Sequence, residues 1–329
     1  MSGKIGILLV NLGTPEATSF WPMRRYLKEF LSDRRVVENR GPVWWFVLNA
    51  IILTRRPVKS GRAYAQIWNT KRGESPLKTI SRAQAEKVDM RYADDPRILV
   101  DWAMRYGEPP IAETIIRLKE AGCERVLLFP LYPQYSAATT ASAMDKVFDA
   151  LKTMRWQPAI RSVPPYFDHP AYIDALARSI RAHRDALGWT PEVTLASLHG
   201  LPKGFIDKGD PYQRHCERTV ELLRDALGLG AEELLLTYQS RSGRVEWLGP
   251  DTEDTIVALA RKGVRNLLIV TPGFASDCVE TLEEIQIRAA QSFLQNGGEN
   301  FSLVPCLNES ANSIHMLCSI IDEQLQGWV

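Results

Sequence analysis

The sequence predicts an α/β protein with two similar halves, each built on a four-stranded, mostly parallel sheet flanked by helices. Eight short apolar runs bounded by turn residues alternate with helical patterns, and this alternation is typical of βαβ units. The runs form two groups of four, separated near Pro164, so we expect domains of residues 1–164 and 165–329. The predicted strands are Ile5–Val10, Ile98–Ala103, Val126–Leu131 and Ile160–Pro164 in the first half, and Val193–Leu198, Leu234–Tyr238, Leu267–Thr271 and Phe301–Pro305 in the second.

Two of the helical patterns form an internal repeat. Residues 112–122 align without gaps on residues 253–263, at an offset of 141 positions. Each copy is followed by an apolar strand that ends in proline, at Pro130 and at Pro272. Ordinary helix composition could produce part of this likeness, and duplication of one half is the interpretation that we favour. The predicted helices are Ile111–Ala121, Ala141–Leu151, Tyr172–Leu187, Pro211–Leu227, Thr252–Lys262 and Asp277–Gln295.

Composition and charge exclude several classes of protein. The 329 residues include 40 Lys and Arg against 39 Asp and Glu, and this net charge of +1 gives no basic surface for nucleic acid. The five cysteines are far apart and show no metal-finger spacing, so we expect free thiols in a reduced, cytoplasmic setting. The first residues lack a secretory signal, and no stretch reaches the roughly 20 apolar residues that span a bilayer.

The segment 42–53 comes closer than any other to the apolar length that spans a bilayer. It contains the adjacent tryptophans Trp44 and Trp45. One interpretation is a core helix. Adjacent tryptophans cannot share one helix face, however, so part of the segment would point outward, toward membrane headgroups or the mouth of an apolar pocket. Basic residues border the segment on both sides, at Arg40, Arg55, Arg56, Lys59 and Arg62.

A histidine at a strand end is the first candidate for chemistry. His199 follows the apolar run Val193–Leu198 and precedes Gly200 and Pro202, which turn the chain. Open parallel sheets bind ligands at this rim. Imidazole exchanges a proton near neutral pH and binds iron, zinc and copper. A histidine that simply packs at the strand end is the alternative interpretation.

Two glutamates follow the clearest strand-to-helix junction of the chain. The apolar run Leu267–Thr271 breaks at a Pro-Gly pair, and a helix is expected to follow with Ser276 or Asp277 as its cap. Glu280 and Glu284 then lie four residues apart on one helix face. The helix dipole alone favours acidic residues there, which is the simpler explanation. If that face meets a cleft, the two carboxylates could bind a cation or exchange protons.

Aromatic and basic side chains gather at other predicted strand ends, in residues 102–106, 132–136 and 238–250. Such groups suit a flat apolar ligand that bears carboxylates. A nucleotide-binding Rossmann enzyme would need a G-x-G-x-x-G loop after the first strand, where only Gly13 is found. A zinc hydrolase would need three protein ligands at a spacing such as H-E-x-x-H, which the sequence lacks.

The chain as a whole resembles the ferrochelatase family, whose members insert ferrous iron into protoporphyrin IX in the last step of haem synthesis. The resemblance begins at Gly6–Glu16 and extends to the final helix. It rests on several short motifs that occur in the family's order. These motifs are Ser197–Pro202, Lys208–Tyr212, Tyr238–Arg241, Trp247–Pro250 and Pro272–Leu282.

The resemblance implies two Rossmann-like domains of the chelatase type, with the last helix, at about residues 310–326, packing back on the first domain. His199 and Glu280 match the pair of family residues that handles metal and protons, and Glu284 matches a secondary acid. Which of His199 and Glu280 would deliver iron and which would accept protons is left open. Residues that match the family's porphyrin pocket are Leu12, Tyr64, Arg105, Tyr135 and Trp247.

The same resemblance implies partners and a location. The substrates would be protoporphyrin IX and ferrous iron, with no organic cofactor and no nucleic acid, and we expect a monomer. The segment 42–53 matches an apolar lip that touches the membrane in relatives, so we expect a cytoplasmic protein with peripheral membrane contact. Two alternatives stay open: a tetrapyrrole chelatase that inserts cobalt, and a haem or metal carrier that binds without turnover.

Two features depart from the pattern of relatives. Some ferrochelatases hold a [2Fe–2S] cluster on four cysteines, but the upstream ligand position is Ala137 here, and Cys306 and Cys318 would be two ligands short without a Cys-rich tail. We therefore expect no cluster. On the glutamate helix, the position four residues after Glu284 is Arg288, which argues against a row of three carboxylates that relays iron or protons.

Overall fold

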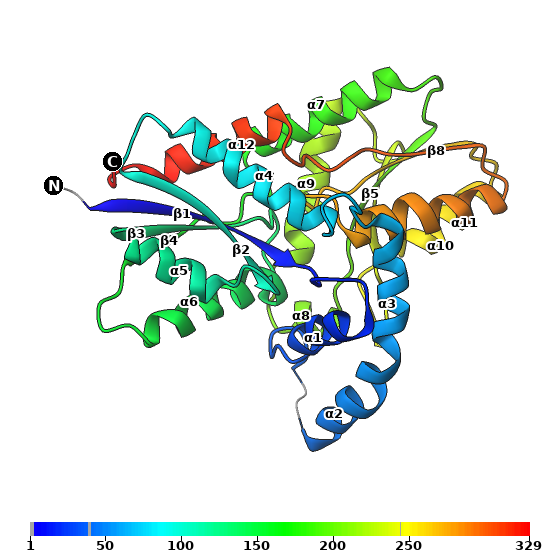
Figure 1. Ribbon diagram of the computed structural model, residues 1–329. Helices are drawn as coiled ribbons and strands as arrows, with labels where there is room; N and C mark the ends of the chain where they lie inside the picture. The colour runs from blue at the N-terminus through cyan, green and yellow to red at the C-terminus, as the bar shows by residue number, and fades with distance from the viewer. Residues whose placement is uncertain (1–2, 39–40, 244) are drawn as a thin grey trace. The chain divides into compact units, whose positions relative to one another are not determined.

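The computed structural model describes residues 3–38, 41–243 and 245–329, which divide into two compact units (Figure 1). The first unit comprises the residues up to Tyr132, Ser136–Pro164 and Leu317–Val329, and the second comprises Pro133–Tyr135 and Pro165–Met316. Each unit holds a four-stranded parallel sheet flanked by helices. The expected α/β fold class, with two similar units and parallel sheets, is confirmed.

The sheet of the first unit has the strand order β2-β1-β3-β4. Its central strand, β1, is buried along nearly its whole length, because helices cover both faces of a parallel sheet. This burial explains why the strand reads as a continuous apolar run. The four strands are β1 (Lys4–Gly13), β2 (Ile98–Tyr106), β3 (Cys123–Pro130) and β4 (Ala159–Ser162).

The helices of the first unit include several that the sequence pattern did not predict. Helices α5 (Ile111–Glu120) and α6 (Ser142–Lys152) match the predicted ones, and a short π-helix, η2 (Ala137–Ala141), precedes α6. Apart from the helical interpretation of the segment 42–53, the sequence pattern predicts no helix in the long connection between β1 and β2. This connection holds α1 (Phe20–Leu31), α2 (Pro42–Phe46), the π-helix η1 (Val47–Ile52), α3 (Leu53–Ile67) and α4 (Pro76–Arg91).

The second unit repeats the topology of the first. Its strand order is β6-β5-β7-β8, so β5 takes the central place that β1 takes in the first unit. Helix α10 (Thr252–Arg261) precedes β7 as α5 precedes β3, which is the placement that the internal repeat requires. The four strands are β5 (Val193–His199), β6 (Leu234–Gln239), β7 (Asn266–Val270) and β8 (Asn300–Leu303).

The other helices of the second unit cover its sheet. Figure 1 shows η3 and α11 running alongside β8. The buried core joins side chains of the sheet to those of η3 and α11, for example Leu195, Ile269, Ile285 and Phe293. These helices are α7 (Pro170–Ala186), α8 (Lys203–Asp207), α9 (Tyr212–Leu227), the π-helix η3 (Glu280–Ala289) and α11 (Ala290–Gln295).

The C-terminal residues are tied to the first unit by polar contacts. The boundary between the units falls within α12 (Ala311–Leu325), whose last residues belong to the first unit. The Tyr92 hydroxyl donates to Asp322 Oδ1 over 2.7 Å, and Arg125 Nη1 donates to the carbonyl of Trp328 over 2.6 Å. The Arg161 guanidinium lies 4.3 Å from the Trp328 ring centre. These contacts fix residues 317–329 on the first unit.

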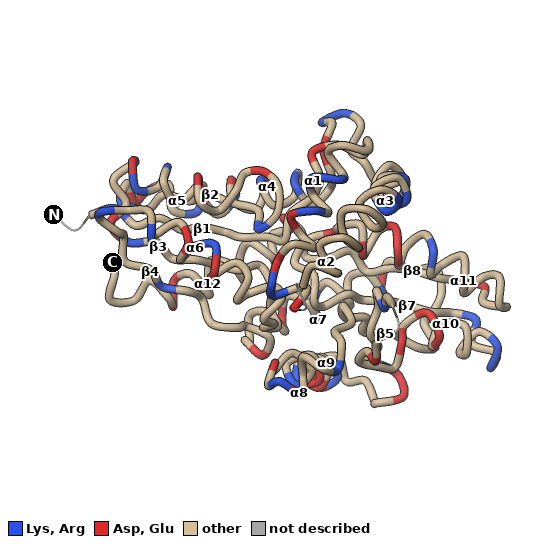
Figure 2. Tube along the Cα trace, turned by 90° about the horizontal axis from the view of Figure 1, so that it is seen from below, with Lys and Arg blue, Asp and Glu red and all other residues tan. Residues whose placement is uncertain are grey.

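Figure 2 shows positions of Lys and Arg interspersed with positions of Asp and Glu along the backbone of each unit. A concentration of one sign is visible along α3, where Arg55, Arg56, Lys59 and Arg62 are found. In the part of the chain that the structure describes, no helix is both long and apolar enough to cross a membrane.

Candidate active site

His199 ends β5 with its side chain exposed at the carboxyl edge of the sheet. Its Nδ1 lies 2.6 Å from the carbonyl oxygen of Gly200. Because a carbonyl oxygen can only accept, Nδ1 carries a proton, and Nε2 is the ring nitrogen left to bind a metal or take up a further proton. The Tyr212 hydroxyl donates to the His199 carbonyl over 3.0 Å and anchors the turn. The ring is therefore oriented as a metal-binding or proton-accepting histidine requires.

The turn after His199 packs against Trp247. A Cβ added at Gly200 would lie 2.7 Å from the carbonyl oxygen of Gln239 and 3.2 Å from the Trp247 ring, so only glycine fits there. The Trp247 indole N–H donates to the Ser242 carbonyl over 2.8 Å, which fixes the plane of the ring. The structure thus brings Trp247, expected from the resemblance to bind porphyrin, next to the turn that carries His199.

Glu280 is the first residue of η3, and a buried amide ties its backbone to the sheet. Gln239, which pairs with His199 in the β5–β6 ladder, donates from Nε2 to the Glu280 carbonyl over 2.8 Å. Its Oε1 accepts from the Ser197 hydroxyl over 2.8 Å. Ser197 Oγ is also 2.9 Å from Thr252 Oγ1. Gln239 and Ser197 were not predicted as site residues, although both lie inside the motifs that carry the resemblance.

The helix that carries the glutamates differs from the expectation. An α-helix over Asp277–Gln295 capped by Ser276 or Asp277 was predicted, but the residues form a π-helix from Glu280 to Ala289 that lacks a side-chain cap. The Asp277 carboxylate is used elsewhere: it accepts from Thr281 Oγ1 over 2.9 Å and from Asn308 Nδ2 over 2.6 Å. The π-helix is rare in proteins and is frequently found at functional sites.

Glu284 is held by both polar groups of one serine. Ser240 donates to its carboxylate from the backbone N–H and from Oγ, each over 2.7 Å. Ser240 adopts a left-handed backbone with φ of 65°, which is uncommon for a residue other than glycine. The left-handed backbone of Ser240 thus allows its N–H and its hydroxyl to donate to the same carboxylate.

The electrostatic surroundings of Glu284 join the candidate residues. Burial raises the pKa of Glu284, whereas the Ser240 hydrogen bond and the charges of His199 and Arg288 act to lower it, and Glu280 acts to raise it. His199, Glu280 and Glu284 are therefore close enough to influence one another. Burial, the largest of these effects, holds the pKa of the Glu284 carboxyl above its usual range, which is the direction expected of a group that exchanges protons nearer to neutral pH.

Arg288 forms ion pairs with the two neighbouring acids of η3. Its Nε lies 3.0 Å from each oxygen of the Glu283 carboxylate, and its Nη2 lies 3.8 Å from Glu284 Oε2. The acidic row therefore ends in a cation that is already paired. This arrangement gives a structural reason for the sequence departure at Arg288.

The remaining expected pocket residues lie apart from this cluster in the sequence and differ in burial. Leu12 is half-buried near the end of β1, and Tyr64 is buried on α3 with its ring edge-on to Tyr26 at 6.4 Å. Both belong to the first unit. Tyr135 is half-buried in the second unit, and its backbone N–H donates to His215 Nδ1 over 3.2 Å.

Arg105, also expected to bind porphyrin, is buried in the first unit. Its guanidinium forms an ion pair with Asp33, and its Nε donates to the Ser142 carbonyl over 3.0 Å. Burial acts to raise the pKa of Asp33, but hydrogen bonds from Ser142 and Tyr106 and the Arg105 charge outweigh burial and lower it. The Arg105 guanidinium is thus held in an internal ion pair, and little of this buried group is accessible to a ligand.

The cysteine side chains are the other candidate metal ligands of the chain. All five thiols are buried and free, and burial raises the pKa of Cys216, Cys278 and Cys306 well above the usual range. Nowhere in residues 3–38, 41–243 and 245–329 do three or more His, Cys, Asp or Glu side chains converge as metal ligands.

Comparison with known proteins identifies the family. A family model described as Ferrochelatase matches residues 4–325. The ferrochelatase of Agrobacterium fabrum (strain C58 / ATCC 33970) is 53% identical over 327 residues, covering 99% of this chain and 95% of that protein. The ferrochelatase of Brucella ovis (strain ATCC 25840 / 63/290 / NCTC 10512) is 53% identical over 326 residues, covering 99% and 93%.

Solved structures show the same fold at low sequence identity. SirB from Bacillus subtilis with Fe³⁺ matches with a TM-score of 0.58 and 11% identity, covering 97% of this chain and 95% of that one. CbiX, described as the terminal enzyme for biosynthesis of siroheme in denitrifying bacteria, matches with a TM-score of 0.53 and 13% identity, covering 97% and 98%. With the family model matched from residue 4 to residue 325, the chain belongs to the ferrochelatase family.

Proposed function

We propose that this enzyme inserts ferrous iron into protoporphyrin IX to form protohaem, with His199 and Glu280 acting on the metal and the pyrrole protons. Insertion exchanges two N–H protons of the ring for one Fe²⁺, so the site must supply a proton acceptor and a metal ligand. The observation that supports this assignment best is the oriented His199 ring, whose free Nε2 is exposed in the same cluster as two carboxylates.

Two assignments of the pair are consistent with this chemistry. In one, His199 Nε2 binds the incoming iron and Glu280 takes the protons; in the other, the roles are exchanged. Gln239 holds the start of η3 against the His199 strand, so the relative position of the pair is set by the fold in either case. Holding the ring in a bent shape would expose its nitrogen lone pairs, at a cost of about 1–5 kcal/mol from binding.

The metal that the enzyme prefers separates the main proposal from the cobalt chelatase. An anaerobic competition assay with protoporphyrin IX and equal Fe²⁺, Co²⁺ and Zn²⁺ should yield protohaem as a major product. Iron and cobalt both suit a site of one imidazole and carboxylates, so some cobalt insertion is compatible with the proposal. Cobalt porphyrin formed without protohaem would instead identify a cobalt chelatase.

Glu284 is proposed as a secondary proton acceptor. We expect Glu284→Gln to lower the metallation rate by about tenfold, corresponding to about 1.4 kcal/mol for one weakened charge-assisted contact. The variant should also change the pH dependence of unfolding. Burial raises the pKa of this carboxyl in the folded state, so the folded protein holds the proton more tightly than the unfolded chain does. The free energy of unfolding therefore falls as pH rises from the unfolded pKa through the folded pKa. The wild type should therefore lose stability relative to the variant as pH rises, measured by urea unfolding, whereas a gap independent of pH would contradict this.

The purified protein is expected to lack an iron–sulfur cluster. Cluster ligation requires thiolates, and burial disfavours the thiolate at Cys216, Cys278 and Cys306, while it raises the pKa of Cys123 to about 11. Fresh anaerobic preparations should show neither cluster absorption nor acid-labile sulfide. Two irons and two sulfides per chain would show that this expectation is wrong.

Peripheral membrane contact is proposed for the segment 42–53. Its outer side chains are strongly exposed, with Val43 at 77%, Trp45 at 67% and Phe46 at 59%, so the segment is not a core helix. Trp44 is half-buried beneath them. Arg55 and Arg56 follow on α3, whereas Arg40 lies outside the described residues. Aromatic side chains beside cations suit reversible docking on anionic lipid.

Replacing both Trp45 and Phe46 by serine should weaken binding to anionic vesicles, measured by sedimentation, by about 10²–10⁴-fold, since each aromatic contributes about 1.5–3 kcal/mol when buried. High salt should weaken binding of the unmodified protein as well. Trp156→Ser is the matched control, because Trp156 is exposed elsewhere on the first unit. If Trp156→Ser lost lipid binding to the same extent, the proposal that the segment 42–53 docks on the membrane would be wrong.

A further inference from the structure

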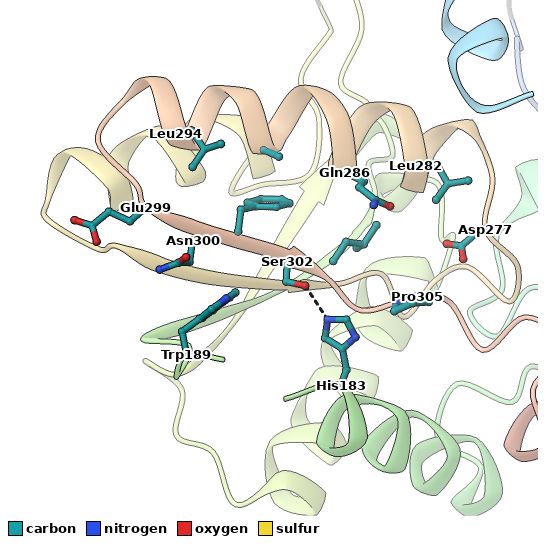
Figure 3. A pocket seen from close by; sticks show the side chains of 13 residues that line it. His183, Trp189, Asp277, Leu282, Gln286, Leu294, Glu299, Asn300, Ser302 and Pro305 are labelled. Atoms are coloured by element: carbon teal, nitrogen blue, oxygen red, sulfur yellow. Dashed lines mark hydrogen bonds between the residues drawn. The ribbon is translucent and has the colours of Figure 1, made fainter. Parts of the chain in front are cut away.

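A cavity of about 590 Å³ lies along the free edge of the sheet in the second unit. Its floor is β8, the last strand in the order β6-β5-β7-β8. Figure 3 shows side chains entering it from the helix above, where Leu282, Gln286 and Leu294 are found, and from His183 and Trp189 on the opposite side. The cavity therefore lies between two layers of secondary structure, where a fifth strand would lie if the sheet continued.

The backbone of β8 presents unused hydrogen-bonding groups to this cavity. Asn300 and Val304 donate to β7 through their N–H groups, to the carbonyls of Arg265 and Ile269. The backbone N–H and C=O groups of successive residues are directed alternately toward the two edges of a strand. Phe301, which follows Asn300, therefore directs its N–H and C=O away from β7.

Leu303 shares this outward direction, and within the described ranges neither residue has a backbone partner outside the sheet ladder. Two donors and two acceptors are thus left at an edge, which is the template for pairing with another extended chain.

The side chains around this edge divide as they would around a central strand. Phe301 and Leu303 point into the apolar core beside η3 and α11. Ser302 points to the other face, where its Oγ lies 2.8 Å from His183 Nε2. An added strand would place alternate side chains against Leu282 and Leu294 on one face and against Trp189 on the other.

The charge of the lining restricts the sequence of such a strand. The thirteen lining residues include the carboxylates Asp277 and Glu299 and no Lys or Arg, and Arg265 approaches Glu299 to 3.7 Å from outside the lining. Burial lowers the pKa of His183, which disfavours its cationic form. Acidic segments would meet like charge here, whereas apolar side chains with flanking lysines would be complementary.

We propose that this edge binds an extended, apolar and non-acidic peptide segment of another protein, which adds to β8 as a fifth strand. Leu282 and Gln286 lie two positions after Glu280 and Glu284, hence on nearly the opposite side of η3. The peptide site is therefore separate from the candidate active site. It does not depend on the identity of the porphyrin or the metal.

Amide hydrogen exchange on the full chain tests strand addition directly. The probe is acetyl-Lys-Val-Thr-Val-Lys-amide at millimolar concentration. We expect the amides of Phe301 and Leu303 to exchange about tenfold more slowly with the peptide, while Asn300 and Ser302, already bonded to β7, change little. A fully N-methylated copy of the peptide and a copy with Glu in place of Lys should give no protection.

A pair of variants places the effect in the cavity. Gln286 is exposed and lines the cavity, so Gln286→Arg should weaken peptide binding about fivefold or more through charge repulsion and lost space. Gln291→Arg, on the exposed side of α11 outside the lining, should bind as the wild type does. No protection at millimolar peptide, equal protection by the N-methylated copy, or equal weakening in both variants would each overturn the proposal.

Discussion

His199→Ala is expected to lower the metallation rate by roughly 10²–10⁴-fold, the range for loss of one positioned acid–base group. The reason lies in the geometry of β5. The Nδ1 proton is used by the Gly200 carbonyl, so Nε2 is the one ring nitrogen left to bind a metal or to accept a proton. The side chain is exposed, so its removal should spare the core and leave thermal stability within about 0.5 kcal/mol.

The kinetic constants of this variant distinguish the two roles. If His199 binds iron, its loss should raise the KM for Fe²⁺; if it accepts protons, kcat should fall with the KM for iron unchanged. His315→Ala is the control, because His315 is an exposed histidine on α12. Near-normal metallation by His199→Ala would contradict the assignment of the site.

Glu280→Gln is expected to cost a similar factor, roughly 10²–10⁴-fold, with porphyrin binding retained. Glutamine keeps the shape of the side chain but removes the charge, so it can neither accept a pyrrole proton nor hold Fe²⁺ strongly. The carbonyl that accepts from Gln239 belongs to the backbone and is unchanged, so the start of η3 should stay in place.

Glu253→Gln is the matched control for this second variant. Glu253 is an exposed acidic residue in the first turn of α10. Its replacement therefore tests the effect of removing a negative charge near a helix N-terminus, apart from the candidate site. Porphyrin binding can be followed by fluorescence quenching in both variants. Equal loss of activity in Glu253→Gln and Glu280→Gln would show that the acidic residues stabilise helices and do no chemistry.

The strands were predictable because buried parallel strands are continuous apolar runs. The Val193–Leu198 run, for example, matches β5 except that His199 extends it. The helices between β1 and β2 were not, because their signals are mixed. Helix α3 contains Pro57 and Gly61, residues that normally argue against a helix interior, yet both are buried within it.

Of the candidate site, only the ionisable residues could be predicted from the sequence. His199, Glu280 and Glu284 stand out because their chemistry and strand-end position are visible in a sequence. The π-helix is not visible in the sequence, and neither are the hydrogen bonds that Asp277 makes with Thr281 and Asn308 instead of capping the helix. Gln239 likewise reads as an ordinary polar residue until the fold brings it to Glu280.

Multiple-turnover metallation under anaerobic conditions tests the central claim most directly. Protoporphyrin IX and Fe²⁺ would be supplied in large excess over enzyme, and loss of free porphyrin absorbance would be followed together with protohaem formation. We predict that each enzyme molecule converts many porphyrins and that His199→Ala nearly stops this conversion. A reaction that ends at one porphyrin per chain would contradict the account and identify a carrier that binds without turnover.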